Sequence, residues 1–102
     1  ARATNNTAEL TALGEALHYL LGQDTLTGPA VLRPDSLYAL DAMVGISKPA
    51  RNKRLVAEVA RLWGEARARW PDAVFVEHSL FWQVKQQLLQ IWELFTLHHL
   101  YL

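Results

Sequence analysis

The last fifteen residues of the chain, 88–102, carry ten apolar or aromatic side chains distributed around the whole circumference of a helix. A surface helix of a small domain needs only one apolar stripe, facing the core. A helix that is apolar on several sides must be covered on all of them, and a chain of 102 residues has little other material for that. We therefore predict that this segment contacts a second protein chain. The ten side chains are Leu88, Leu89, Ile91, Trp92, Leu94, Phe95, Leu97, Leu100, Tyr101 and Leu102.

The size and composition of the chain indicate one folded domain spanning residues 1–102. Apolar residues make up 51% and charged residues 20%, which is not the composition of a disordered chain. The chain has no cysteine, so disulfides and thiolate–zinc sites are excluded.

The spacing of the apolar residues predicts an all-α domain of four helices. Ser47 and Ser79 are suitable N-caps for the third and fourth helices, and Pro49 is tolerated in a first turn. Residues 22–34 have turn residues and no period, so they are predicted to form one long loop. Residues 73–76 fit either an extended segment or a helical turn. The predicted helices are residues 7–21, 35–44, 48–70 and 80–101.

The charges are unevenly distributed although the net charge is zero. Residues 48–69 hold seven basic and two acidic side chains, 7 − 2 = +5, and the remainder is therefore −5. One interpretation is internal matching of a basic helix with an acidic body. The alternative is a docking surface for an acidic partner.

The residue types needed for catalysis or metal binding are not brought together by the sequence pattern. Glu15 and His18 stand three apart on one helix, but this pair supplies only two ligands, and His98 and His99 point in different directions. There is no nucleophile elbow and no glycine-rich phosphate loop. We predict no enzyme activity, no metal and no cofactor.

The sequence also lacks the pattern of a membrane protein. No run of about 18 uncharged apolar residues occurs, and polar residues such as Lys85 and Glu93 interrupt the last helix. The N-terminal residues have no apolar signal core. We expect no membrane association and a cytoplasmic location.

A helix-turn-helix that binds DNA is the alternative function, because residues 37–54 read as two helices joined at Gly45 with a basic second helix. Asp41 and Arg51 argue against it, since that motif has buried small or aliphatic side chains there. Zero net charge also gives little affinity for phosphate, so nucleic acid is not the expected partner. The candidate DNA-binding residues are Lys48, Arg51, Asn52, Lys53 and Arg54.

The fourth predicted helix supplies the candidate protein-binding residues. Tryptophan and tyrosine dominate the energetics of protein interfaces, and Trp82 and Trp92 lie off the main apolar seam of this helix. A homodimer, or the capture of another protein by the same surface, would cover them. The candidate partner-binding residues are Phe81, Trp82, Leu89, Trp92, Phe95, Leu97, Leu100 and Tyr101.

Two stretches, EALHYLLGQDTLTGP at 15–29 and VEHSLFWQVKQQLLQIWELFTLHHLYL at 76–102, resemble the small quorum-sensing anti-activator proteins of pseudomonads. The resemblance extends over most of the chain but includes no diagnostic motif, so it assigns no functional residue. It implies a non-enzymatic regulator that binds the ligand-binding domain of a LuxR-type transcription factor. Such a regulator keeps that factor from dimerising on DNA.

Overall fold

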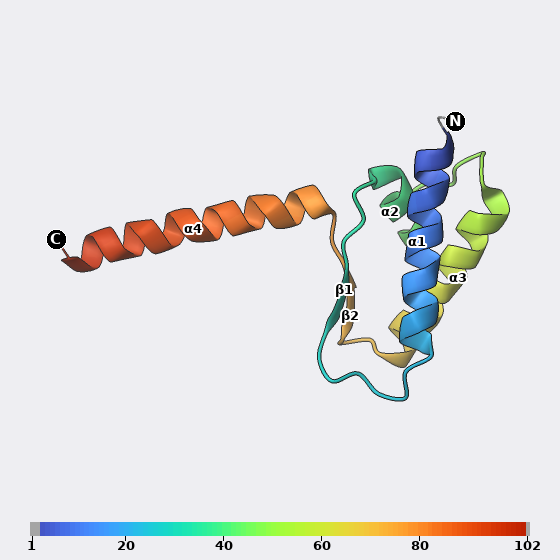
Figure 1. The fold of residues 1–102 in the computed structure, drawn as a ribbon, viewed down its shortest axis with the longest axis horizontal. Coiled ribbons are helices and arrows are strands. Elements are labelled where there is room, and N and C mark those ends of the chain that lie inside the picture. Colours follow the sequence, from blue (N-terminus) through green and yellow to red (C-terminus); the bar gives the residue numbers. More distant parts are fainter. Residues whose placement is uncertain (1–2, 102) are drawn as a thin grey trace.

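The computed structural model describes residues 3–101 of the chain, and it describes side chains for residues 5–94. The described part contains four helices and a two-stranded parallel sheet (Figure 1). The elements in order are α1 (Ala3–Leu21), β1 (Ala30–Leu32), α2 (Leu37–Val44), α3 (Lys53–Arg69), β2 (Val74–Val76) and α4 (Ser79–Tyr101). The predicted four-helix architecture is confirmed, and the sheet is an addition to it.

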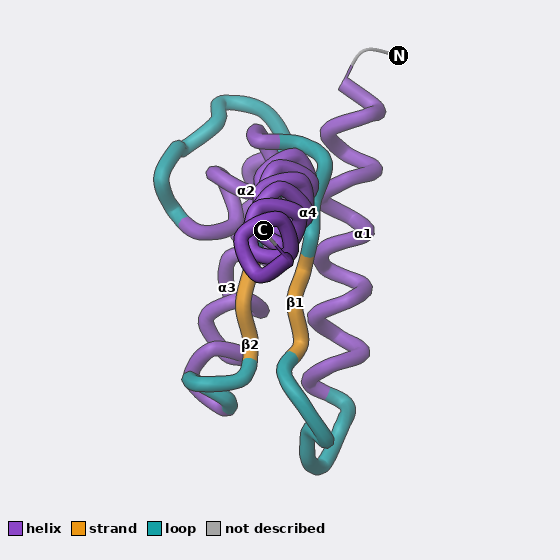
Figure 2. Tube along the Cα trace, turned by 90° about the vertical axis from the view of Figure 1, so that its left-hand side faces the viewer, coloured by secondary structure: helices purple, strands orange, loops and turns teal. Residues whose placement is uncertain are grey.

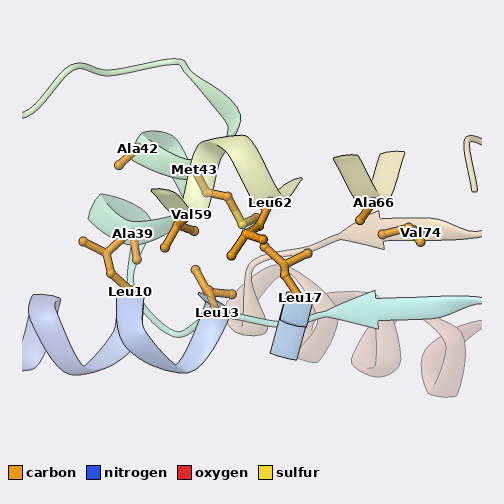
Figure 3. Packing of buried hydrophobic residues seen from close by; sticks show 10 residues of the cluster. All are labelled: Leu10, Leu13, Leu17, Ala39, Ala42, Met43, Val59, Leu62, Ala66 and Val74. Carbon is orange, nitrogen blue, oxygen red and sulfur yellow. The ribbon is translucent and has the colours of Figure 1, made fainter. Parts of the chain in front are cut away.

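Helices α1, α2 and α3 pack into a body with one apolar core (Figure 3). The periodic leucines of α1 are buried there, as the spacing predicts, against Val59 and Leu62 of α3. A Cβ added to Gly14 would lie 3.5 Å from a methyl carbon of Val59, so α1 and α3 approach closely at this glycine. Burying one large apolar side chain stabilises a fold by roughly 1.5–3 kcal/mol. The buried core consists of Leu10, Leu13, Leu17, Ala39, Ala42, Met43, Val59, Leu62, Ala66 and Val74.

The prediction that residues 22–34 form only a loop is wrong, because Ala30–Leu32 is strand β1. It pairs in parallel with β2, with Val31 opposite Phe75, and α2 and α3 form the connection between the two strands. The ambiguous segment 73–76 is resolved as extended. Two strands of three residues are too short to show a period of two in the sequence, and their hydrogen-bond partners lie more than 40 residues away.

The third helix begins at Lys53 and not near Ser47, which corrects the sequence prediction. Helix α2 ends at Gly45, whose φ of 88° is in the left-handed region, and the amides of Gly45, Ile46 and Ser47 all donate to the carbonyl of Asp41. Pro49 has no amide to donate and disfavours a helical conformation at the residue before it. The chain therefore crosses from α2 to α3 in an eight-residue connection, 45–52.

Helix α4 begins at Ser79, as predicted, and projects away from the body as a long arm (Figures 1 and 2). Its first turn is attached to the segment before α2: the Ser79 amide donates to the Pro34 carbonyl, and the Ser79 hydroxyl donates to the Asp35 carboxylate. The projection makes the molecule elongated. Its radius of gyration is 17.1 Å, whereas about 13 Å is typical of a compact chain of this length.

Candidate functional site

The most unusual surface of the molecule is the apolar surface of α4. Its large apolar side chains from Leu80 to Leu94 are between 43 and 68% exposed, apart from the half-buried Trp82. Together they expose on the order of 1,000 Å² of apolar area, if a large side chain offers about 200 Å². A typical monomer has no apolar patch larger than about 300–600 Å². We call this the α4 surface: Leu80, Phe81, Val84, Leu88, Leu89, Ile91, Trp92 and Leu94.

The predicted partner-binding residues fall into three groups. Phe81, Leu89 and Trp92 are 60, 52 and 64% exposed and belong to the α4 surface. Trp82 is half-buried, and the guanidinium of Arg33 lies 4.7 Å from the centroid of its ring. In this structure the body leaves the described large apolar side chains of α4 exposed, with Trp82 as the exception. The remaining candidates, Phe95, Leu97, Leu100 and Tyr101, lie outside the residues whose side chains are described.

A groove of about 850 Å³ lies where α4 leaves the body, and we call it the root groove. Sequence reasoning missed it, since its walls come from the sheet, from α2 and from the first turns of α4. In the sequence, only the order Val74-Phe75-Val76 indicates an extended segment here. In the structure Phe75 is 42% exposed and faces away from the core, whereas Val74 is buried. The apolar wall consists of Val31, Leu37, Leu40, Phe75, Val76, Leu80, Phe81 and Val84.

Two charged side chains that line the root groove, Lys85 and Glu77, form an ion pair. The Nζ of Lys85 lies 3.1 Å from Oε1 of Glu77, and the Glu77 side chain is only 15% exposed. No hydrogen bond reaches this buried oxygen, so the ammonium of Lys85 is what offsets its burial. The pair ties the second turn of α4 to the end of β2.

The candidate DNA-binding residues lie on the connection between α2 and α3 and on the first turn of α3. Lys48, Arg51, Lys53 and Arg54 are exposed, but Asn52 is half-buried. Its amide nitrogen donates to the hydroxyl of Tyr38, and its oxygen accepts from Thr7, so its side chain is engaged within the body. A helix-turn-helix also has a turn of three to four residues, whereas eight separate these two helices. The geometry therefore argues against the DNA-binding alternative.

Three basic residues further along α3 are engaged within the molecule. Arg61 pairs with Glu58 and Glu65 on the exposed side of the helix, and its hydrogen bonds lower the pKa of Glu58 below the ordinary value. Arg67 donates to the carbonyl of Val74, and Arg69 donates to carbonyls at the end of α1 and in the loop that follows. Among the described residues, no ion pair joins α3 to the acidic remainder of the chain, because Arg61 pairs within α3 and Arg67 and Arg69 bind neutral carbonyls.

Within the described part of the chain, no cluster of three or more potential metal ligands occurs. Glu15 and His18 are both exposed on α1, and His98 and His99 lie beyond the described side chains. As for a bilayer, none of the helices in the described residues has the length and apolarity to cross one.

Comparison with known proteins identified no relative of this chain. No protein-family profile matches the chain, and no curated protein or solved structure matches it significantly.

Proposed function

We propose that this chain is a non-enzymatic regulatory protein that binds another protein through the α4 surface and occludes it. The observation that carries the proposal is the exposure of eight large apolar side chains on one projecting helix. Leaving them in water is unfavourable and promotes aggregation, whereas a protein partner would remove them from water. Helices with an apolar face are a common means of filling a groove on a second protein.

The resemblance to the quorum-sensing anti-activators supplies the class of partner. In this proposal α4 lies on the ligand-binding domain of a LuxR-type transcription factor, over the surface with which that domain dimerises. The factor then cannot dimerise or bind DNA, and no covalent chemistry is needed. Action on a transcription factor agrees with a cytoplasmic location.

The same helix supports self-association when the partner is absent. Phe81, Val84, Leu88 and Ile91 follow one another at intervals of three and four residues, the spacing of a coiled-coil seam. About 800 Å² per chain is buried in a standard protein interface, and the α4 surface is of that size. We therefore propose a homodimer through α4, which competes with the partner for one surface.

The test is the double variant Leu88→Ala with Ile91→Ala, two residues of this seam, compared with Ile46→Ala. Ile46 is 74% exposed but lies on the connection between α2 and α3, so it is a matched control for loss of an exposed apolar group. Light scattering and co-purification with the ligand-binding domain of a LuxR-type factor measure the two kinds of association. We expect the double variant to weaken both at least tenfold, which is the effect of losing about 1.4 kcal/mol. Helicity by circular dichroism should not change.

A monomeric parent protein that also fails to bind the factor would overturn the proposal. So would an equal loss of association in Ile46→Ala. A collapse of helicity in the double variant would show that the two side chains stabilise the fold and do not form an interface.

A further inference from the structure

The basic residues of 48–69 fall into two groups, those whose side chains bind other groups of the same molecule and those that form no ion pair. Arg61, Arg67 and Arg69 bind acidic side chains or backbone carbonyls of the same molecule. Lys48, Arg51, Lys53 and Arg54 have no ion pair with any described residue. All four are exposed and lie within seven consecutive residues. A local concentration of four uncompensated positive charges therefore remains at the start of α3.

A second groove lies at the same place, and we call it the basic groove. It runs between the end of α2, the connection 45–52 and the first two turns of α3, and its volume is about 590 Å³. None of its lining residues belongs to α4. We call the small side chains of its lining on α2 and α3 the floor: Ala42, Val56, Ala57 and Ala60. The two uncompensated lysines, Lys48 and Lys53, also line the groove.

We propose that the basic groove binds an acidic helical segment of a partner protein. The small side chains of the floor allow a helix backbone to approach closely, because helix axes packed on small residues lie at the short end of the 8–10 Å range. Lys48 and Lys53 would meet carboxylates on that segment, with Arg51 and Arg54 extending the positive field beyond the groove. This site is separate from α4 and stands whether or not α4 is the occluding surface.

The observations favour an acidic peptide over a nucleic acid or a lipid surface. The lining of the groove contains no aromatic side chain on which a base could stack. Most of the lining is apolar and concave, whereas a phosphate backbone or a flat lipid surface needs only the exposed cations. Charge and shape thus agree on a partner that is acidic and also has an apolar face.

The experiment uses the full chain and a fluorescein-labelled synthetic peptide of about 14 residues, four helical turns, built from alanine, leucine and glutamate. A second peptide has glutamine in place of every glutamate. Fluorescence anisotropy measures both affinities. We expect the glutamate peptide to bind at micromolar concentration and the glutamine peptide at least tenfold more weakly.

Matched variants separate the groove from general attraction between charges. Lys53→Glu and Arg61→Glu make the same change in net charge on one helix, but only Lys53 lines the groove. Ala57→Leu fills the floor, and Ala68→Leu makes the same substitution at an exposed position outside the groove. Lys53→Glu and Ala57→Leu should each weaken binding about tenfold, and the two controls less than twofold. Circular dichroism confirms that each variant is folded.

Several results would overturn the proposal. Failure of the glutamate peptide to bind is one, and equal weakening by Arg61→Glu is another, since it would show attraction to net charge alone. No effect of Ala57→Leu would show that the floor is not used. Displacement of the peptide by duplex DNA or by anionic phosphatidylserine vesicles, with the same sensitivity to Lys53→Glu and Ala57→Leu, would assign the groove to those ligands.

Discussion

Leucines of the body and leucines of α4 have opposite surroundings in one small protein. Leu10, Leu13 and Leu17 of α1 are 0 to 6% exposed, whereas Leu88 and Leu94 of α4 are 59 and 68% exposed. Both helices are rich in leucine, so composition does not explain the difference. The difference shows that burial depends on whether another element of the chain lies against the helix.

The reason lies in how each helix is connected. Helix α1 is followed by a loop and a strand that lead into α2 and α3, and both of these helices pack against it. Helix α4 follows β2, and its first turn is held to Pro34 and Asp35, at the end of the body away from the loop between α1 and β1 (Figure 1). Its axis points away from the core (Figure 1). The body is stabilised from within, and α4 has to find apolar contacts elsewhere.

The largest expected effect contrasts one leucine from each region. Leu17→Ala should lower the free energy of unfolding by about 2–5 kcal/mol, because it leaves a cavity in the core. Leu88→Ala should change it by less than about 0.5 kcal/mol, because its side chain is already in water. Urea denaturation at a protein concentration low enough to prevent association measures both. An equal loss in the two variants would remove the distinction between body and arm.

Replacing either of two glycines of the body by alanine should change the stability of the body, in opposite directions, and leave association through α4 unchanged. Gly45→Ala should lower stability by about 1–2 kcal/mol, since its φ of 88° strains any side chain. Gly64→Ala should raise stability by about 0.5–1 kcal/mol, because Gly64 lies within α3 and an added methyl would meet no atom within 4 Å. Thermal unfolding gives both values, and light scattering should show unchanged association. A change in association would mean that the body and α4 are coupled.

Removal of residues 80–102 should cost the body no more than about 1 kcal/mol, because no residue of the buried core lies in the described part of α4 and the Lys85 ammonium is half exposed. The truncation deletes the Lys85–Glu77 ion pair and the packing of Arg33 on Trp82. The shortened chain should unfold in one cooperative transition, followed by circular dichroism. Loss of cooperativity would show that α4 belongs to the core.

The smallest expected effect is electrostatic and confined to α3. The hydrogen bond from Arg61 lowers the pKa of Glu58, so this pair stabilises the fold above the pKa of the unfolded chain, and the stabilisation is lost as the pH falls through the lower folded value. Arg61→Gln should raise the pKa of Glu58 toward 4.5, and Arg54→Gln should not change it. Titration of the Glu58 carboxyl by NMR measures this. An ordinary pKa in the parent protein would contradict the pairing.

The fold was predictable from the sequence where its causes are local. The period of Leu10, Leu13 and Leu17 indicated α1, and Ser79 indicated the start of α4. The strands Ala30–Leu32 and Val74–Val76 were not predictable, because each is too short for a pattern and is stabilised by the other. The start of α3 was misplaced because bonds to the Asp41 carbonyl, together with Pro49, favour a non-helical connection.

Some features of the candidate sites could likewise be predicted from the sequence, and others depend on the tertiary structure. The excess of apolar side chains in the last helix is a property of the amino acids themselves, and so is the +5 charge of residues 48–69. Only the tertiary structure decided that α4 projects from the body, that Arg61 and Arg69 are internally paired and that Lys48 and Lys53 are not. Periodicity and charge are read along the chain, but exposure and pairing depend on which distant segments the fold places side by side.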